Sequence, residues 1–203
     1  MRTIGITGGV GAGKSLVLDY IQKHYPAQIY KADEIANYLK EPGKSCYRPI
    51  VDLLGKQVLS GDGTIHKNKM AELIFKSPGL LEQVNAIIHP AVKNFIMTRI
   101  EEEKNKKEKA FFILEAALLI EEGYDKILDE LWYIRAEEKS RRGRLQSQRQ
   151  YSEEKIQNIM GHQLTDTESL RYCKVVIDNN GNPEDTYKQI DDKLGEYIGA
   201  ESK

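Results

Sequence analysis

Cysteine is scarce in this sequence of 203 residues, and neither sign of charge is in excess. The two cysteines, Cys46 and Cys173, lie far apart and form no CxxC pair, so a structural disulfide or a thiolate zinc site is not expected. The 30 basic and 31 acidic residues leave a net charge of -1, whereas a surface that follows nucleic-acid phosphates normally carries a clear basic excess. We therefore expect a protein that does not bind nucleic acid and that works in a reducing compartment.

Long hydrophobic runs are also missing. No segment approaches the roughly 20 apolar residues that a helix needs to cross a bilayer, and the first residues show neither the apolar core nor the cleavage site of a signal peptide. We expect no membrane partner and a cytoplasmic location. The hydrophobic fraction of 40% is enough for the core of one medium-sized domain.

Five short apolar segments are spaced along the chain in the manner of buried strands. Between them lie segments with apolar residues at helical spacing, such as residues 14–24, and a last amphipathic helix is predicted from Pro183 onward. The predicted strands are residues 3–7, 27–30, 110–114, 130–134 and 174–177. Strands that alternate with helices predict an α/β fold, with a five-stranded parallel sheet flanked by helices.

Two stretches do not follow this alternation. Residues 56–108 are almost wholly helical in pattern, and residues 137–170 are helical and highly charged. We interpret the first as a helical substrate-binding region and the second as a lid with its supporting helix. Residues 1–55, 109–136 and 171–203 then form the α/β core of a single domain.

The most specific motif is GGVGAGKS at residues 8–15, which matches GxxxxGK[ST] between a predicted strand and a predicted helix. Glycines let the backbone curl so that successive N–H groups point at phosphate oxygens, and the helix adds its positive end. Lys14 can reach the β- and γ-phosphates, and Ser15 can ligate Mg²⁺. The predicted nucleotide contacts are Gly8, Gly9, Val10, Gly11, Ala12, Gly13, Lys14 and Ser15. The motif predicts binding of ATP or a close relative and transfer of its γ-phosphate.

Three carboxylates are candidates for the remaining chemistry. Glu115 directly follows the third predicted strand, where a magnesium ligand is expected, and Glu121 is the other candidate for that role. Asp33 follows the second strand, at the edge where α/β sheets bind ligands, and could orient or deprotonate an attacking hydroxyl. As the N-cap of a helix that runs to Leu39, Asp33 would need no other role, so the residues alone leave both interpretations open.

Transfer of a phosphoryl group also needs cations. Residues 139–144, KSRRGR, and Arg149 supply several, and the planar guanidinium of arginine can pair with two phosphate oxygens. A solvated helix face explains most of these charges, so we expect one or two of them, Arg141 and Arg149, to contact ATP. A tight turn after the fifth strand is enough to explain Asn179-Asn180-Gly181. His24, His66 and His162 are expected to be ordinary packing residues.

The ordered motifs resemble the dephospho-coenzyme A kinase family over nearly the whole chain. The segments that carry the resemblance are ITGGVGAGKS at the start, KADEIANYLKEPG at 31–43, DGTIHKNKMAELIF at 62–75, NAIIHP at 85–90, LEAALLIEEGY at 114–124, the arginine-rich lid, Gln163 and VIDNNG at 176–181. The resemblance implies a P-loop kinase with a nucleotide core, a helical coenzyme-binding region and a lid. It also implies transfer of the ATP γ-phosphate to the 3′-hydroxyl of the ribose of dephospho-CoA, with ATP and Mg²⁺ as cofactors. Separately, we expect a monomer or weak homo-oligomer.

The same resemblance suggests roles for individual residues. Asp33 matches the acid that activates the ribose hydroxyl, and His89 falls where the family contacts the coenzyme substrate. Asn180 lies near the adenine end of ATP. Further expected substrate contacts are Lys67, Glu115, Leu118 and Glu121.

The chain departs from the family pattern at several positions. Lys31 replaces an aspartate, and Lys67 replaces an arginine that would offer a bidentate fork. Glu115 replaces an aspartate, and Ala117 stands where the family has proline. The P-loop lysine and Asp33 are unaffected, so the departures bear on substrate affinity and rate more than on reaction type.

Three other functions compete with this one. Another small-molecule kinase of the same architecture would share the P-loop, and a nucleotide-binding relative with weak or lost turnover would explain Lys31, Lys67 and Ala117. A GTPase-like switch is disfavoured, because the DxxG matches at 52–55 and 192–195 do not follow a strand in the position that a switch needs.

Overall fold

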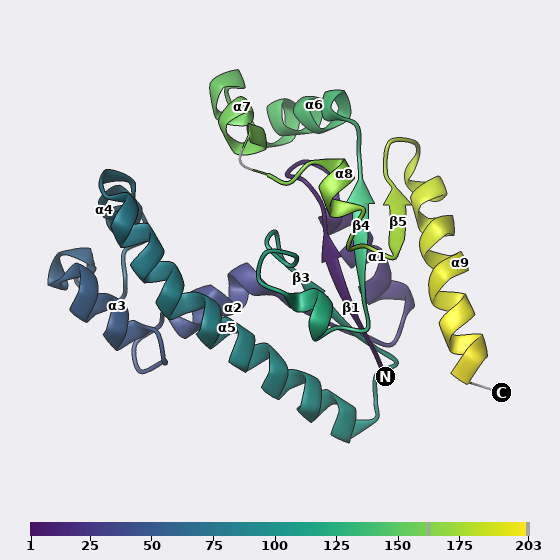
Figure 1. The fold of residues 1–203 in the computed structure, drawn as a ribbon, viewed down its shortest axis with the longest axis horizontal. Helices are drawn as coiled ribbons and strands as arrows, with labels where there is room; N and C mark the ends of the chain where they lie inside the picture. The colour runs from purple at the N-terminus through teal and green to yellow at the C-terminus, as the bar shows by residue number, and fades with distance from the viewer. Residues whose placement is uncertain (162, 202–203) are drawn as a thin grey trace. The chain divides into compact units, whose positions relative to one another are not determined.

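The computed structural model describes residues 1–161 and 163–201, so His162 lies outside the described residues. Five strands form one sheet in the order β2-β3-β1-β4-β5 (Figure 1). β1 pairs in parallel with both β3 and β4, and β4 pairs in parallel with β5. The strands are β1 (Arg2–Thr7), β2 (Ala27–Lys31), β3 (Phe111–Glu115), β4 (Glu130–Arg135) and β5 (Val175–Asp178). The predicted five-stranded sheet flanked by helices is confirmed, and each strand boundary lies within one residue of its expected place.

The central strands are buried because they have neighbours on both sides. Five of the six residues of β1 are buried, as parallel strands covered by helices should be. At Gly5 there is no room for a side chain, because a Cβ there would overlap the side chains of Leu119, Leu128 and Leu131. The core around these strands includes Ile4, Ile6, Val17, Ile21, Ile113, Trp132, Ile134, Ile177, Ile190 and Leu194.

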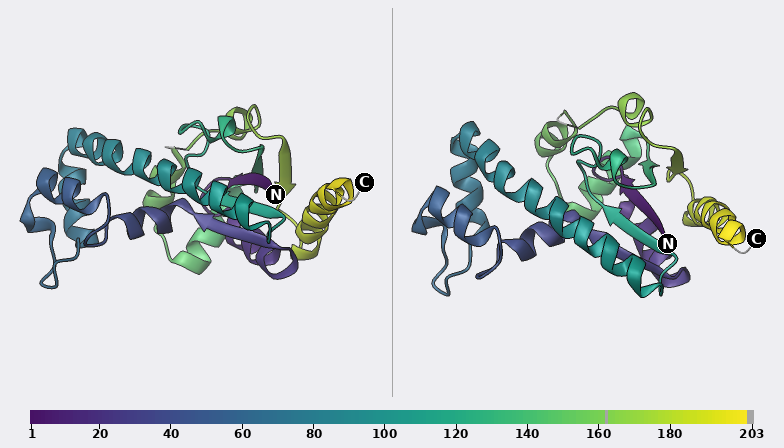
Figure 2. Two further views of the ribbon diagram at one scale, coloured as in Figure 1. Left: turned by 90° about the horizontal axis from the view of Figure 1, so that it is seen from below. Right: turned by 60° about the horizontal axis from the view of Figure 1, so that its bottom comes forward.

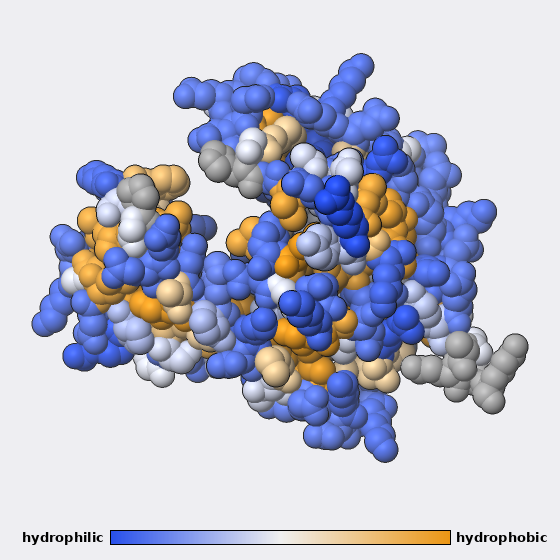
Figure 3. Space-filling view, in the orientation of Figure 1, coloured by the Kyte–Doolittle hydropathy of each residue, from blue (hydrophilic) through white to orange (hydrophobic). Residues whose placement is uncertain are grey.

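Two helices pack beside each other against this core. They are α1 (Lys14–His24) and α9 (Pro183–Glu201), which contact one another, and α9 also contacts β5 (Figure 1). α1 begins at Lys14 and α9 begins at Pro183, as the sequence predicts. The charged segment after β4 forms α6 (Glu138–Arg149) and α7 (Glu153–Gly161), followed by α8 (Asp166–Ser169). Figure 3 shows hydrophilic residues over most of the α6–α7 surface in that view.

The chain forms two compact units, one made of residues 1–30 with 106–203 and the other of residues 31–105. We call them the nucleotide unit and the helical unit. The helical unit begins before residue 56, because the helices after β2 pack with it. The three-part division by function, with a separate lid at 137–170, stays a prediction.

The helical unit contains a series of helices and one short 3-10 turn. They are α2 (Ala32–Leu39), α3 (Tyr47–Leu54), η1 (Lys56–Val58), α4 (Lys67–Lys76) and α5 (Pro78–Lys106), whose last residue belongs to the nucleotide unit. A second 3-10 turn, η2 (Tyr124–Lys126), lies in the nucleotide unit. Figure 2 shows α3 and α4 near the start of α5 in both views. α5 continues through Pro90.

One expectation for this unit is wrong. Asp33 is not the N-cap of α2, because the helix begins at Ala32 and its N-cap is Lys31, which makes no side-chain capping bond. Asp33 is already the second helical residue, and its side chain is exposed. Asp33 is therefore an acid in the first turn of α2, where its negative charge interacts favourably with the positive end of the helix.

The two cysteines agree with the prediction from the sequence, whereas His66 does not. Cys46 and Cys173 are both free and buried, as expected of packing residues without a disulfide. His66 differs from the expectation, because it is the N-cap of α4 and its Nδ1 accepts a hydrogen bond from Lys69 N at 3.4 Å. No helix among residues 1–161 and 163–201 is long and apolar enough to span a bilayer.

Candidate active site

The P-loop connects the end of β1 to the start of α1. Gly11 and Gly13 have φ angles of 80° and 91°, in the left-handed region that side chains other than glycine rarely adopt. Gly13 is also crowded, because a Cβ there would overlap the side-chain amide of Asn179. The loop therefore needs glycine at these positions for two reasons, backbone conformation and close approach.

Lys14, the first residue of α1, extends its side chain back to the start of this loop. Its Nζ donates to the carbonyl of Gly8 at 2.9 Å and lies 3.6 Å from Glu115 Oε1. Burial lowers the pKa of Lys14, while the carboxylate of Glu115 opposes that shift. Ser15, the next residue, is exposed at the first turn of α1. The arrangement brings together the lysine and the strand-end carboxylate that the sequence singles out.

Arg141 reaches the P-loop from α6. Its Nε donates to the carbonyl of Val10 at 2.9 Å, and its Nη2 donates to Gln163 Oε1 at 2.7 Å. The same Gln163 oxygen accepts the N–H of Val10 at 3.1 Å. Of the two arginines expected near ATP, Arg141 thus contacts the loop directly. Arg149 is exposed, but its charge is close enough to contribute to the lowered pKa of Lys14.

A second arginine contact was not predicted. Arg144 Nη1 donates to the carbonyl of Ala12 at 3.2 Å, and its Nη2 donates to the carbonyl of Asn179 at 2.6 Å. Asn179 is buried, and its Nδ2 donates to Ala12 O at 2.7 Å. The predicted Asn180 instead accepts from the N–H of Glu137 at 2.6 Å. Helix and turn patterns do not show which of two neighbouring side chains faces the loop.

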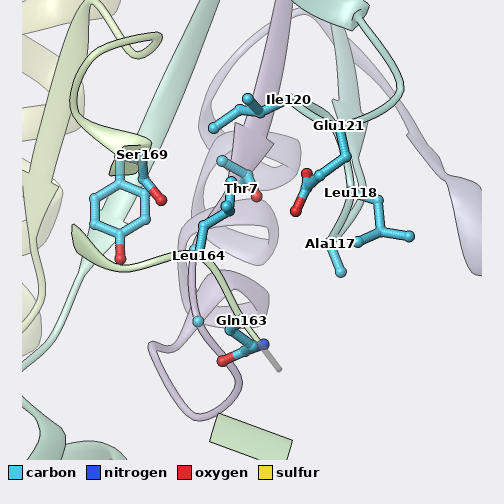
Figure 4. A pocket seen from close by; sticks show the side chains of 11 residues that line it. Thr7, Ala117, Leu118, Ile120, Glu121, Gln163, Leu164 and Ser169 are labelled. Carbon is cyan, nitrogen blue, oxygen red and sulfur yellow. The ribbon is translucent and has the colours of Figure 1, made fainter. Parts of the chain in front are cut away.

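A small pocket lies beside the first glycines of the loop. It is lined by Gly8 and Gly9, by Leu118 and Glu121 from the segment after β3, and by Gln163 among others. Figure 4 shows the carboxylate of Glu121 directed toward Thr7 at the end of β1. Leu118 and Glu121, both predicted to bind substrate, therefore lie next to the P-loop.

Three predicted substrate residues, Asp33, Lys67 and His89, belong to the helical unit. Lys67 is the first residue of α4 and lines a cleft of about 190 Å³ together with Lys40, Glu41 and Met70. Burial lowers the pKa of Lys40, the positive charge of Lys67 lowers it further, and the carboxylate of Asp33 opposes both effects. No sequence pattern distinguishes Lys40, because it is one lysine at the end of a helix.

His89 lies in α5, well inside the helix and half-buried. A position inside the helix rules out a capping role for this histidine.

The oxygen donors of the P-loop region fit magnesium bound to a nucleotide. Ser15 offers a hydroxyl and Glu115 a carboxylate, and Mg²⁺ in such sites takes one or two protein ligands, with phosphates and waters supplying the others. In the part of the chain that the structure describes, no group of three or more histidine, cysteine, aspartate or glutamate side chains could hold a metal alone. A metal at this site would thus need oxygens from the nucleotide as well.

Comparison with known proteins points to one family. The family model described as dephospho-CoA kinase matches residues 2–185. A dephospho-CoA kinase from Dehalococcoides mccartyi is 38% identical over 185 residues, which cover 91% of this chain and 92% of the relative. One from Fusobacterium nucleatum is 34% identical and covers 93% of this chain and 94% of its own. The solved structure of TT1252 from Thermus thermophilus has a TM-score of 0.79 at 26% identity and covers 96% of this chain and 97% of its own.

Proposed function

The chain belongs to the dephospho-CoA kinase family, and on that premise we propose that it transfers the γ-phosphate of ATP to the 3′-hydroxyl of the ribose of dephospho-CoA. The products are ADP and CoA, so the reaction completes the synthesis of coenzyme A. The observation that carries the proposal is the intact P-loop, in which Lys14 lies against Gly8 and Glu115 in a chain that matches one kinase family from residue 2 to residue 185.

The nucleotide unit would bind ATP. The N–H groups of residues 8–15 and the start of α1 would hold its phosphates, and Asn180 would lie near the adenine. Lys14, whose ammonium is already withdrawn from water, would balance the charge on the β- and γ-phosphates. Arg141 would add a second cation and Arg149 a third. Ser15 and Glu115 would hold Mg²⁺, which neutralises phosphate charge when bound.

The helical unit would present the acceptor. The exposed carboxylate of Asp33 would orient the ribose hydroxyl and take its proton as the oxygen attacks phosphorus. Lys67 would pair with a phosphate group of dephospho-CoA, and His89 would contact the coenzyme. In the nucleotide unit, Leu118 and Glu121 would contact the same substrate from the pocket beside Gly8 and Gly9.

The proposal includes the setting in which the enzyme works. Dephospho-CoA is its small-molecule partner, and we propose that it acts in the cytoplasm as a monomer or weak homo-oligomer.

The test is a coupled assay of the purified protein with ATP, Mg²⁺ and dephospho-CoA, followed for ADP and for CoA. We expect ADP to form in proportion to CoA and only when dephospho-CoA is present. A panel of other hydroxyl acceptors, including nucleoside monophosphates and shikimate, serves as the specificity control. ADP formation that does not depend on dephospho-CoA would contradict the proposal.

A further inference from the structure

Gln163 accepts two hydrogen bonds at one oxygen. Its Oε1 lies 3.1 Å from Val10 N and 2.7 Å from Arg141 Nη2. Because both neighbours are donors, the side-chain oxygen rather than the amide nitrogen must face them. Gln163 thus links the P-loop to an arginine of α6.

Gly9 makes room for the same arginine. A Cβ at Gly9 would overlap the guanidinium carbon and both terminal nitrogens of Arg141. Gly9 is not among the glycines with positive φ, so alanine would fit the backbone there without strain. The glycine is therefore explained by the space that Arg141 occupies and not by the conformation of the loop.

Arg141 is held at two of its three side-chain nitrogens. Nε is bonded to Val10 O at 2.9 Å and Nη2 to Gln163, while Nη1 has no partner within residues 1–161 and 163–201. Such an arrangement fixes the plane of the guanidinium and leaves N–H donors for a phosphate oxygen. A cation that is already oriented loses less conformational entropy when its ligand arrives.

We propose that Gln163 and Gly9 together fix the position of the Arg141 guanidinium, Gln163 by a hydrogen bond and Gly9 by leaving space for it. Gln163 is then a positioning residue for ATP that acts through this arginine. The proposal rests on the proposed function, in which Arg141 contacts the nucleotide. It adds that the segment after α7, which carries Gln163, sets where a cation of α6 meets the phosphates. Gln163 itself stays bonded to Val10 and does not touch the reacting atoms.

The experiment is a double-mutant cycle. Gln163→Met keeps the length of the side chain and removes the acceptor, and Arg141→Met removes the cation. The Kd of a non-hydrolysable ATP analogue is measured by calorimetry for the parent, both single variants and the double variant, and kcat and KM are measured for both substrates. We expect Gln163→Met to weaken ATP binding about tenfold in the parent, as for loss of a hydrogen bond to a charged group, and less than about twofold in the Arg141→Met background. Because Gln163 also lines the pocket beside Gly8 and Gly9, the Kd of the ATP analogue, and not the KM for dephospho-CoA, decides the test.

A second cycle uses Gly9→Ala, which should displace the guanidinium and weaken ATP binding by a similar factor. In the Arg141→Met background, the same change should have little effect. Gly143→Ala is the matched control, because Gly143 lies in α6 beside Arg142 and has nothing within 4 Å of its added Cβ. This control should leave the Kd for the ATP analogue as it is in the parent. Thermal melting of every variant separates misplacement of Arg141 from loss of the fold.

Several results would overturn the proposal. Effects of Gln163→Met and Arg141→Met that simply add would mean that Gln163 acts on ATP or on the fold independently of Arg141. Tighter ATP binding by Gln163→Met would mean that the glutamine oxygen blocks the loop. A Gly9→Ala variant with the parent's Kd for the ATP analogue would mean that Gly9 does not help to position Arg141. If the parent binds the analogue but does not phosphorylate dephospho-CoA, only the proposed function fails, because the cycles are read from ATP binding.

Discussion

The two units of this molecule prepare for their ligands in different ways. In the nucleotide unit, the loop that would hold phosphate is bonded to side chains from distant parts of the sequence, with Arg141 and Gln163 on Val10 and Asn179 on Ala12. In the helical unit, Asp33 and Lys67 are exposed. The proposed nucleotide site is thus held in place by bonds within the protein, whereas the proposed acceptor site presents exposed charges that the acceptor itself would complete.

The largest effect should come from the exposed acid. Asp33→Asn removes the group that would take the hydroxyl proton, and we expect kcat to fall on the order of 10²- to 10⁴-fold with little change in either KM. The measurement is steady-state kinetics of ADP formation with dephospho-CoA. Glu34→Gln is the matched control, because Glu34 is the adjoining exposed acid of the same helix. A kcat within a few-fold of the parent would remove Asp33 from the mechanism.

Loss of the P-loop lysine should affect the nucleotide unit alone. Lys14→Met keeps the length of the side chain and removes its charge, so we expect kcat to fall about 10²- to 10³-fold, the usual cost of a lost transition-state donor. Calorimetry should show that dephospho-CoA still binds. The control is Lys23→Met, an exposed lysine in the last turn of α1. A parent-like rate would mean that another cation faces the phosphates.

The buried cysteines make it possible to follow each unit separately. Burial raises the pKa of the Cys46 thiol, and it raises that of Cys173 to about 11, so at pH 8 both native thiols are protonated and unreactive. Labelling then occurs only when a unit opens. An ATP analogue at ten times its Kd should slow labelling of Cys173 about tenfold, and dephospho-CoA should do the same for Cys46. Mass spectrometry of the labelled peptides distinguishes the two, and equal protection of both thiols by the ATP analogue would contradict independent opening.

The smallest expected effect is that of substituting Lys67, which stands at a position where the family has arginine. Lys67→Arg would supply two parallel N–H donors in place of a point charge, and we expect the KM for dephospho-CoA to fall about two- to fivefold. The KM for ATP should not change, because the substitution lies in the helical unit. Lys69→Arg, two residues along in α4 and bonded to Leu59 O, is the control. An unchanged KM for dephospho-CoA would place Lys67 outside the acceptor site.

Local patterns were enough to predict most of the fold. The strands were found because each is a short apolar run, and α1 because its start coincides with the P-loop lysine. The capping role of Asp33 was wrong because the residue before Ala32 already serves as the helix N-cap. His66 as a cap was missed because a histidine at that position does not resemble the usual capping residues.

The candidate site was predictable only in part, for a physical reason. A motif such as GxxxxGK[ST] determines its own local geometry, and so Lys14 could be placed from the residues alone. The choice among Arg141, Arg142 and Arg144, or between Asn179 and Asn180, depends on how a helix or a turn is rotated against the loop. That rotation is set by packing between segments more than 100 residues apart, such as the contact of Arg144 with Ala12, and no spacing within one segment reveals it.

The position of β1 at the centre of the sheet has a consequence for the order of events during synthesis. Its register partners Arg2 and Phe111 are 109 residues apart (111 minus 2), and its other neighbour, β4, begins at Glu130. The strand that leads into the P-loop must therefore wait on the ribosome for both partners, whereas the contacts of α3 and α4 with η1 are local and can form earlier. The phosphate loop is therefore made before either of the strands that hold β1 in the sheet.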